Sequence, residues 1–259
     1  MNIDSYLKKD YITNLLETEE KRISGRELEE VRPLTIIKGY VADKACGSAY
    51  VKLGDTEVLA GITMTVGEPY PDSPTSGVMS TSVEFRPIAH PAFESGPPRE
   101  DAIEVARVID RGIRESKCID FDKLYIQEDK VWMVNIDIHI LNHSGNLIDA
   151  GGYAAIAALL NTQVPKFDGT KIVRGEWDRK LEIECTPVPF TFSKIGSKII
   201  LDTDMDEEYA QDARLTVTTT DTLNAMQKGG VGAFKPDEVK ALVKKAFEMS
   251  GTIRSQLEA

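Results

Sequence analysis

Cysteine and histidine are both scarce in this sequence, with three of each among 259 residues. Cys46, Cys118 and Cys185 are odd in number and far apart, which predicts reduced thiols rather than a disulfide framework. His139 and His143 have a spacing that would suit a metal site on a helix, but His139 falls in a strand pattern. We therefore expect packing or surface roles for these histidines, no metal site and no cofactor.

Long apolar runs and positive charge are scarce as well. No apolar stretch approaches the ~18 residues of a membrane span, and residues 1–6 lack the basic start and apolar stretch of a signal peptide. We expect a cytoplasmic protein without membrane contact. The chain has 31 basic and 42 acidic residues, a formal net charge of −11, which excludes nucleic-acid binding through bulk charge. Any contact with RNA or DNA must come from a local cluster of arginines.

Apolar residues make up 41% of the chain, which is enough for a sizeable core. Their patterns predict an α+β arrangement in two lobes, with a boundary near residues 165–185. The expected helices are residues 10–22, 100–116, 147–160 and 236–257, and the expected strands are residues 34–41, 48–53, 57–66, 83–85, 124–126, 132–141 and 214–219. A further β-rich run is expected from 185 to 201, and residues 226–234 are expected to form a hairpin or a strand edge.

An acidic run extends from Leu201 to Glu208, between two expected strands. Several carboxylates in such a segment could hold a hard cation such as Mg²⁺ or protonate a leaving group. The run lacks the residue spacing of a calcium-binding loop. Its composition favours the simpler interpretation, a solvated acidic loop that joins two strands.

A basic stripe is predicted on the helix at residues 100–116. Arg107, Arg111 and Arg114 lie within about 60° of one another on a helical wheel, opposite the apolar residues of the helix. Their guanidinium groups could bind phosphates. Glu100 and Glu104 share the stripe and could instead neutralise it through ion pairs within the helix, so the pattern alone leaves both interpretations open.

Other motifs indicate ordinary structure. The run Gly229–Gly232 lacks the following lysine and serine or threonine of a P-loop, so we expect a turn. Trp132 and Trp177 are single aromatics rather than a stacking platform for bases. No set of serine, histidine and aspartate indicates nucleophilic catalysis.

Several stretches, taken together and in order, resemble the RNase PH family. They are Gly25-Arg26 and Arg32-Pro33-Leu34 (its opening signature, with Ser24 where aspartate is usual), Cys46 to Ala60 (its first β-meander) and Leu201 to Val217 (its active-site strand–loop–strand). The resemblance runs roughly from Arg22 to Met249. It implies an RNase PH-like fold of two lobes. The first, residues 27–167, would be like domain 2 of ribosomal protein S5; the second RNase PH domain would be residues 186–259, and a helical arm of residues 1–26 would precede both.

Within this family, residues 93–98 and 102–114 resemble the non-catalytic ring subunits of the archaeal exosome. This resemblance implies a hexameric ring of three heterodimers with a catalytic RNase PH-like subunit. S1-domain cap proteins would sit on one face, and single-stranded RNA would be threaded inward for 3′–5′ phosphorolytic degradation. It also implies RNA-binding roles for Arg107 and Arg111, which match arginines that ring subunits present toward the RNA path.

Two departures from the pattern of active family members bear on catalysis. The pattern that active members carry has two aspartates six residues apart. In this sequence Asp202 matches the first aspartate, and Glu208 stands at the position of the second. The longer side chain would displace the carboxylate by about an ångström, enough to cost ~100-fold in rate. Active members also carry a phosphate-binding arginine after the central strand, and here Leu147 stands at that position and offers no donor.

The function expected is thus a structural and RNA-binding subunit without catalytic residues of its own. An alternative is that the chain is itself an active phosphate-dependent 3′–5′ exoribonuclease, in which Asp202 and Glu208 share the role of acid or metal ligand. A third interpretation, an S5-like small-molecule kinase or metal hydrolase, is weakened by the missing nucleotide-binding loop.

Overall fold

The computed structural model describes residues 3–41 and 44–259. Residues 1–2 lie outside the described residues; they belong to the predicted helical arm and to the stretch predicted not to be a signal peptide. Residues 42–43 of the first predicted domain also lie outside the described residues. No helix in the described ranges is long and apolar enough to span a membrane. The three cysteines are free thiols, as predicted.

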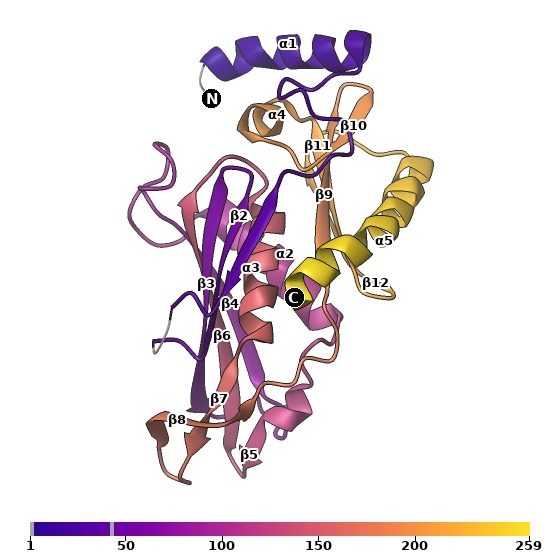
Figure 1. Ribbon diagram of the computed structural model, residues 1–259. Coiled ribbons are helices and arrows are strands. Elements are labelled where there is room, and N and C mark those ends of the chain that lie inside the picture. Colours follow the sequence, from indigo (N-terminus) through magenta and orange to yellow (C-terminus); the bar gives the residue numbers. More distant parts are fainter. Residues whose placement is uncertain (1–2, 42–43) are drawn as a thin grey trace.

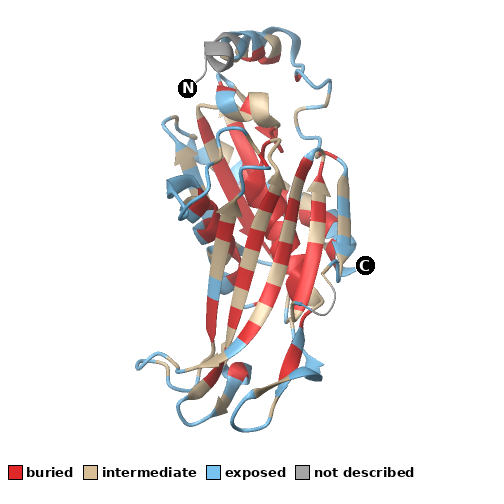
Figure 2. Ribbon diagram, turned by 90° about the vertical axis from the view of Figure 1, so that its left-hand side faces the viewer, coloured by how far each residue is buried: buried red, intermediate tan, exposed pale blue. Residues whose placement is uncertain are grey.

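The first lobe is built on one sheet whose strands follow the order β1-β2-β3-β6-β4, with β5 beside β6 (Figure 1). Its strands are β1 (Leu34–Lys38), β2 (Gly47–Leu53), β3 (Thr56–Gly67), β4 (Val78–Phe85), β5 (Tyr125–Gln127) and β6 (Lys130–Asn142), and the 3-10 helix η1 (Phe121–Leu124) precedes β5. Buried and partly exposed residues alternate along β3 and β6, because one face is covered and the other is open (Figure 2). The predicted meander at the start of the chain is confirmed. Strand β4 begins five residues earlier than the predicted start at residue 83, because the polar residues 80–82 hide its pattern.

Two helices, α2 (Glu100–Glu115) and α3 (Leu147–Leu160), lie between this sheet and a second sheet (Figure 1). Helix α3 has the bounds that the sequence predicts, and it is buried along nearly its whole length. It packs against β2 and β3 on one side and against β9 on the other. Small residues permit this close approach: a Cβ added at Gly152 would lie 2.7 Å from Cγ of Pro189.

The second lobe is a sheet in the order β10-β9-β11-β12. Its elements are β9 (Val188–Ile195), β10 (Lys198–Leu201), α4 (Met205–Ala210), β11 (Ala213–Thr219), β12 (Leu223–Gly230) and α5 (Pro236–Glu258). Almost every residue of β9 is buried, because α3 and α5 both pack against this strand. Strand β12 is the predicted edge strand, but it ends at Gly230. One continuous apolar core extends from Ala49 to Leu257 and joins the two lobes.

Two further parts of the chain differ from the prediction. Strands β7 (Gln163–Phe167) and β8 (Ile172–Lys180) form a separate two-stranded sheet that was not predicted, because β8 is largely exposed and charged and shows no apolar alternation. Helix α1 (Ile3–Glu19) begins and ends earlier than residues 10–22 and packs on α4. The domain boundaries given above, 27–167 and 186–259, remain predictions.

The tight packing of α3 gives the first testable prediction. Gly152→Ala should lower the free energy of unfolding by about 1–3 kcal/mol, because the added methyl group collides with Pro189. The matched change Gly251→Ala in α5, where a Cβ has no neighbour within 4 Å, should raise it by ~0.5–1 kcal/mol through helix propensity. Urea denaturation measures both values, and a similar shift in the two variants would contradict the packing argument.

Candidate functional site

The side chain of Asp202 is the centre of a buried network at the end of β10. Its residue is 1% exposed and has the left-handed backbone angle φ 52°. Oδ1 accepts hydrogen bonds from Arg32 Nη2 at 2.7 Å and from Asn146 Nδ2 at 2.8 Å. Oδ2 accepts from the backbone N–H and from Nε of Arg32, at 2.8 and 2.9 Å. Burial alone would raise the pKa of Asp202, but the hydrogen bonds and charge of Arg32 hold it below the ordinary value.

A second buried ion pair lies beside it. Arg22 donates from Nε and Nη2 to the two carboxylate oxygens of Glu207, and neither side chain has any exposed surface. Arg22 also donates to the backbone carbonyls of Leu201 and Asp202, both at 2.8 Å. Glu207 in turn accepts from the backbone N–H of Asp204 at 3.0 Å, so the two residues form the capping box that begins α4.

These contacts correct both interpretations of the acidic run 201–208. It is not a solvated loop, since residues 205–210 form a helix and Asp202 and Glu207 are buried in ion pairs. It is also not an open cation site, because those carboxylates are occupied by arginines. Nowhere in residues 3–41 and 44–259 does the structure place three or more metal-ligating side chains so that they could hold a metal ion.

The start of α3 carries a third buried carboxylate, that of Asp149, which was not predicted from the sequence. Asp149 accepts from Asn146 Nδ2 at 2.8 Å and from Thr191, at 2.9 Å from its backbone N–H and 2.7 Å from its hydroxyl. Burial raises the pKa of Asp149 to about 6, against the hydrogen bonds that lower it. The spacing of Asn146 and Asp149 before an apolar run is a helix-start signal that could have revealed this cap. The contact ties α3 to β9.

The side chain of Glu208, from α4, lies at the N-terminal end of α3. Its Oε2 accepts the backbone N–H of Asn146 at 3.3 Å. Burial raises the pKa of Glu208, the nearby charge of Asp101 adds to this, and the charge of Arg214 opposes it. Leu147, the next residue of the helix, is 5% exposed and provides no side-chain donor.

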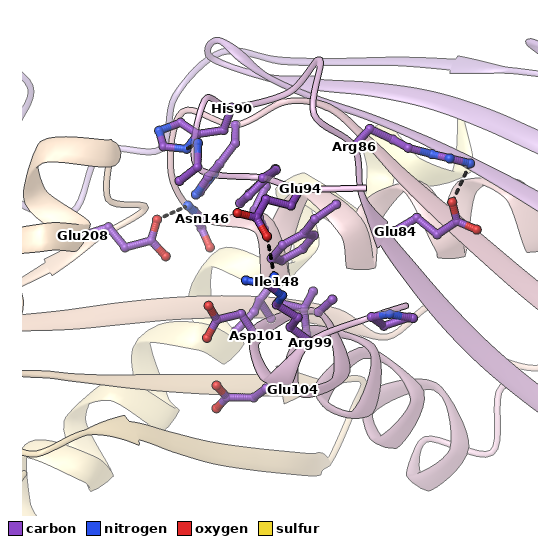
Figure 3. Close-up of a pocket in the computed structure, with 18 of the residues that line it drawn as sticks. Glu84, Arg86, His90, Glu94, Arg99, Asp101, Glu104, Asn146, Ile148 and Glu208 are labelled. Atoms are coloured by element: carbon purple, nitrogen blue, oxygen red, sulfur yellow. Dashed lines mark hydrogen bonds and ion pairs between the residues drawn. The ribbon is translucent and has the colours of Figure 1, made fainter. Parts of the chain in front are cut away.

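A cavity of about 450 Å³ lies between residues 84–99, the start of α2 and α4 (Figure 3). Five carboxylates and three guanidinium groups line it, namely those of Glu84, Glu94, Asp101, Glu104, Glu208, Arg86, Arg99 and Arg214. Each guanidinium already binds a carboxylate: Arg214 binds Glu104 at 2.7 Å, and the other pairs are Arg99 with Glu94 and Arg86 with Glu84. Two of the lining carboxylates, those of Asp101 and Glu208, thus form no ion pair with a lining guanidinium.

Aromatic rings form one wall of this cavity. The ring of Phe93 stacks on Phe85 at 4.5 Å between centroids and on His143 at 5.4 Å. His90 meets His143 edge-on at 5.6 Å. Burial, with the charges of His90 and Arg32, lowers the pKa of His143 to about 4, so this ring is neutral at neutral pH. His143 therefore has a packing role, as the sequence predicts.

The arginine stripe of α2 lies elsewhere, beside the edge strand β4, where a second hollow of about 370 Å³ is found. Arg114 pairs with Asp110 at 3.0 Å, and Arg111 donates to Oε1 of Gln227 on β12 at 3.0 Å. Arg107 is exposed and makes no hydrogen bond or ion pair with the described part of the chain.

The alternative in which Glu100 and Glu104 neutralise the stripe is therefore wrong, although Asp110 of the same helix does pair with Arg114. Glu104 pairs with Arg214 of β11 instead of a stripe arginine. Glu100 forms no ion pair with a described residue.

The glycines near the end of β12 serve packing rather than phosphate binding. A Cβ at Gly229 would lie 2.8 Å from Cζ of Arg214, so the missing side chain lets that guanidinium lie against β12. Gly230 has the left-handed φ of 79°, and the N–H of Gly232 donates to the carbonyl of Asp212 at 2.7 Å. The chain bends back here, consistent with the predicted turn.

Comparison with known protein families gives two matches that follow each other along the chain. Residues 30–165 match domain 1 of the 3′ exoribonuclease family, RNase PH, and residues 185–249 match domain 2. A curated relative, exosome complex component Rrp42 of Thermococcus kodakarensis, is 47% identical over 99% of this chain and 96% of its own length. The component of the same name from Methanocella arvoryzae is 46% identical over 97% of this chain and 96% of its own length.

Solved structures give the same result. A chain of the Archaeoglobus fulgidus exosome with RNA bound to the active site superposes with a TM-score of 0.91 and 42% identity, covering 98% of this chain and 99% of that one. A chain of an archaeal exosome core has a TM-score of 0.87 and 39% identity, over 99% and 98% of the two chains. Rice Rrp46, at 16% identity and a TM-score of 0.70, is similar in fold alone.

The buried carboxylate of Asp149 gives a prediction about pH. Its pKa is about 6 in the folded chain and has an ordinary value of 3.8, so protonation of Asp149 stabilises the fold. This contribution is fully present below about pH 4 and is lost as the pH rises through about 6. An uncharged asparagine at this position can still accept from Asn146 Nδ2 and the Thr191 N–H, and its amide can donate to the Thr191 hydroxyl. Asp149→Asn should therefore gain roughly 3 kcal/mol of stability relative to the wild type between pH 4 and pH 7.5.

Urea denaturation of both proteins across this pH range measures that gain. The change Asp237→Asn, at a side chain that is 98% exposed, controls for the loss of one negative charge. A stability difference between Asp149→Asn and the wild type that does not vary with pH would contradict the assignment.

Proposed function

The chain belongs to the RNase PH family of 3′ exoribonucleases, and from this premise we propose that it is a non-catalytic, RNA-binding subunit of an archaeal exosome ring. In this proposal it pairs with a catalytic RNase PH-like subunit and helps to shape the active site of that partner. Three such heterodimers form the hexameric ring, S1-domain cap proteins bind one face, and single-stranded RNA is degraded from its 3′ end in the cytoplasm. The similarity to exosome component Rrp42 and to chains of archaeal exosome structures supports the assignment to an exosome.

The observation that carries the non-catalytic assignment is the position of Glu208. Phosphorolysis requires inorganic phosphate beside the scissile bond, held by hydrogen-bond donors. Here the carboxylate of Glu208 already accepts the N–H of Asn146 at the start of α3, where an anion would otherwise be favoured. Leu147 replaces the expected arginine, and the surrounding cavity has more carboxylates than guanidinium groups. A phosphate ion would be repelled from this site.

The state of Asp202 supports the same conclusion. Both of its oxygens accept hydrogen bonds from Arg32, and one also accepts from Asn146. A carboxylate with a lowered pKa and this many donors stays ionised at neutral pH, so it has no proton to give to a leaving group. Asp202 therefore acts as a structural residue that connects the two lobes.

RNA binding is assigned to Arg107 and Arg111. Both side chains are exposed beside the hollow at β4, and Arg107 has no partner among the described residues. A free guanidinium on a chain of net charge −11 provides the local positive charge that contact with a phosphate backbone needs. The bond from Arg111 to the neutral Gln227 leaves the charge of that arginine uncompensated.

One observation favours a second candidate, an active phosphate-dependent 3′–5′ exoribonuclease. Glu208 faces a cavity, and burial raises its pKa, as a general acid requires. In that case Glu208 would protonate the leaving oxygen while phosphate attacks the scissile bond.

An activity assay separates the two candidates. The purified chain, mixed with 5′-labelled single-stranded RNA and phosphate, should produce no trimming, whereas its complex with the catalytic subunit should shorten the RNA and release nucleoside diphosphates. The variant Glu208→Gln of this chain should leave the activity of the complex within about twofold, because its carboxylate takes no part in the reaction. Trimming by the chain alone that disappears in Glu208→Gln would establish the second candidate.

The role of the arginines is tested by charge reversal in the assembled ring. Arg107→Glu combined with Arg111→Glu should weaken RNA capture by at least about tenfold and reduce its salt dependence, since phosphate contacts are lost. The control is Lys171→Glu with Arg174→Glu, which makes the same change of charge around the β7–β8 turn. Fluorescence anisotropy measures RNA binding, and size-exclusion chromatography checks assembly. A ring that dissociates in the first variant would show that the arginines form interface ion pairs instead.

A further inference from the structure

The 450 Å³ cavity holds negative charge that its own arginines do not neutralise. Asp101, in the first turn of α2, makes no hydrogen bond or ion pair with a described residue. Glu208 of α4 has only the backbone N–H of Asn146 as a donor. Both carboxylates line the cavity and lie in the left half of Figure 3, although they belong to helices far apart in the sequence. Burial raises the pKa of Glu208 and the charge of Asp101 adds to this, whereas the charges of Arg214 and Arg32 oppose it.

Part of the remaining lining is apolar and aromatic. The stacked rings of Phe85 and Phe93 and the neutral ring of His143 form one side, and Leu147 and Ile148 contribute aliphatic surface. Aromatic faces attract cations and also pack well against methylene groups. The volume lies in the range of ~300–1,000 Å³ that is typical of sites for small organic ligands. The lining therefore suits a ligand that is both cationic and partly hydrocarbon.

We propose that this cavity binds a linear organic polycation, a protonated di- or polyamine, with ammonium groups at Asp101 and Glu208 and methylene groups against the Phe93 wall. This amine site goes beyond the proposed function. It rests on the proposed function in one respect, namely that the cavity does not bind phosphate, because a site that prefers cations would not also hold an anion.

The chemistry of the lining distinguishes an amine from other cations. A divalent metal ion would require several ligands around one point, and no group of three such side chains is found in the described ranges of the chain. An amine distributes its charge along a chain and can therefore reach carboxylates on two different helices. Its ammonium groups also donate hydrogen bonds to carboxylate oxygens.

The test is isothermal titration calorimetry of the full chain with spermidine, without RNA or phosphate. We expect saturable binding of one spermidine per chain at physiological ionic strength. Asp101→Asn combined with Glu208→Gln should weaken it at least tenfold. The control Asp122→Asn with Glu128→Gln removes two exposed carboxylates that do not line the cavity, and it should stay within twofold of the wild type. Magnesium chloride at equal ionic strength should not displace the amine.

Three outcomes would overturn the proposal. Equal affinity in the cavity variant and the control would mean that spermidine binds the acidic surface at large. Binding of inorganic phosphate but not of spermidine would mean that the site keeps an anion preference. If spermidine does not bind and the cavity variant fails to assemble with the catalytic subunit, the carboxylates hold a basic side chain of a neighbour. The activity of the chain alone, measured separately, reports on the proposed function in each case.

Discussion

The structure depends on two buried ion pairs that join the beginning of the chain to the segment after β10. Arg22 binds Glu207 and Arg32 binds Asp202, across separations of 185 and 170 residues. Removal of one partner of a buried ion pair leaves an unpaired buried charge and lowers the free energy of unfolding by several kcal/mol. Each residue of these pairs therefore depends on the other. Because Asp202 also binds Asn146, the same cluster fixes the start of α3. The first sheet, the central helix and α4 therefore meet at one polar point inside an otherwise apolar molecule, and the cavity that carries the proposed chemistry lies directly beside it.

Elements with a clear local pattern could be predicted from the sequence. The α+β class, the RNase PH resemblance, the strands of the first meander and the bounds of α3 are confirmed. The burial of Asp202 and Glu207 could not be predicted, because a run of acidic residues looks solvated until distant arginines are placed on it. Strand β8 could not be predicted for a related reason. It is held by pairing with β7, and its side chains show no apolar alternation.

The candidate site could likewise be predicted only in part. The resemblance directed attention to Glu208 and Leu147 as departures from an active pattern, and the structure adds that Glu208 binds the N–H of Asn146. For the stripe on α2, the sequence left ion pairing and ligand binding open, because it could not show that Glu104 turns toward Arg214. Asp149 and its bonds to Thr191 were missed, since a cap residue of this kind looks like an ordinary helix start. The roles of Arg107 and Arg111 in RNA binding remain a prediction.

The burial of α3 on all sides has a consequence for the order in which the protein folds. Residues 147–160 leave the ribosome before β9, which begins at Val188 and covers one side of this helix. Until that strand has followed, the nascent first lobe exposes a helix made almost entirely of apolar residues and lacks Asp202 as the partner of Arg32. The packing of α3 between the two sheets therefore couples the maturation of the two lobes during synthesis. The fold closes late, when the second sheet is available, and the interval before closure is when the chain is most exposed to aggregation.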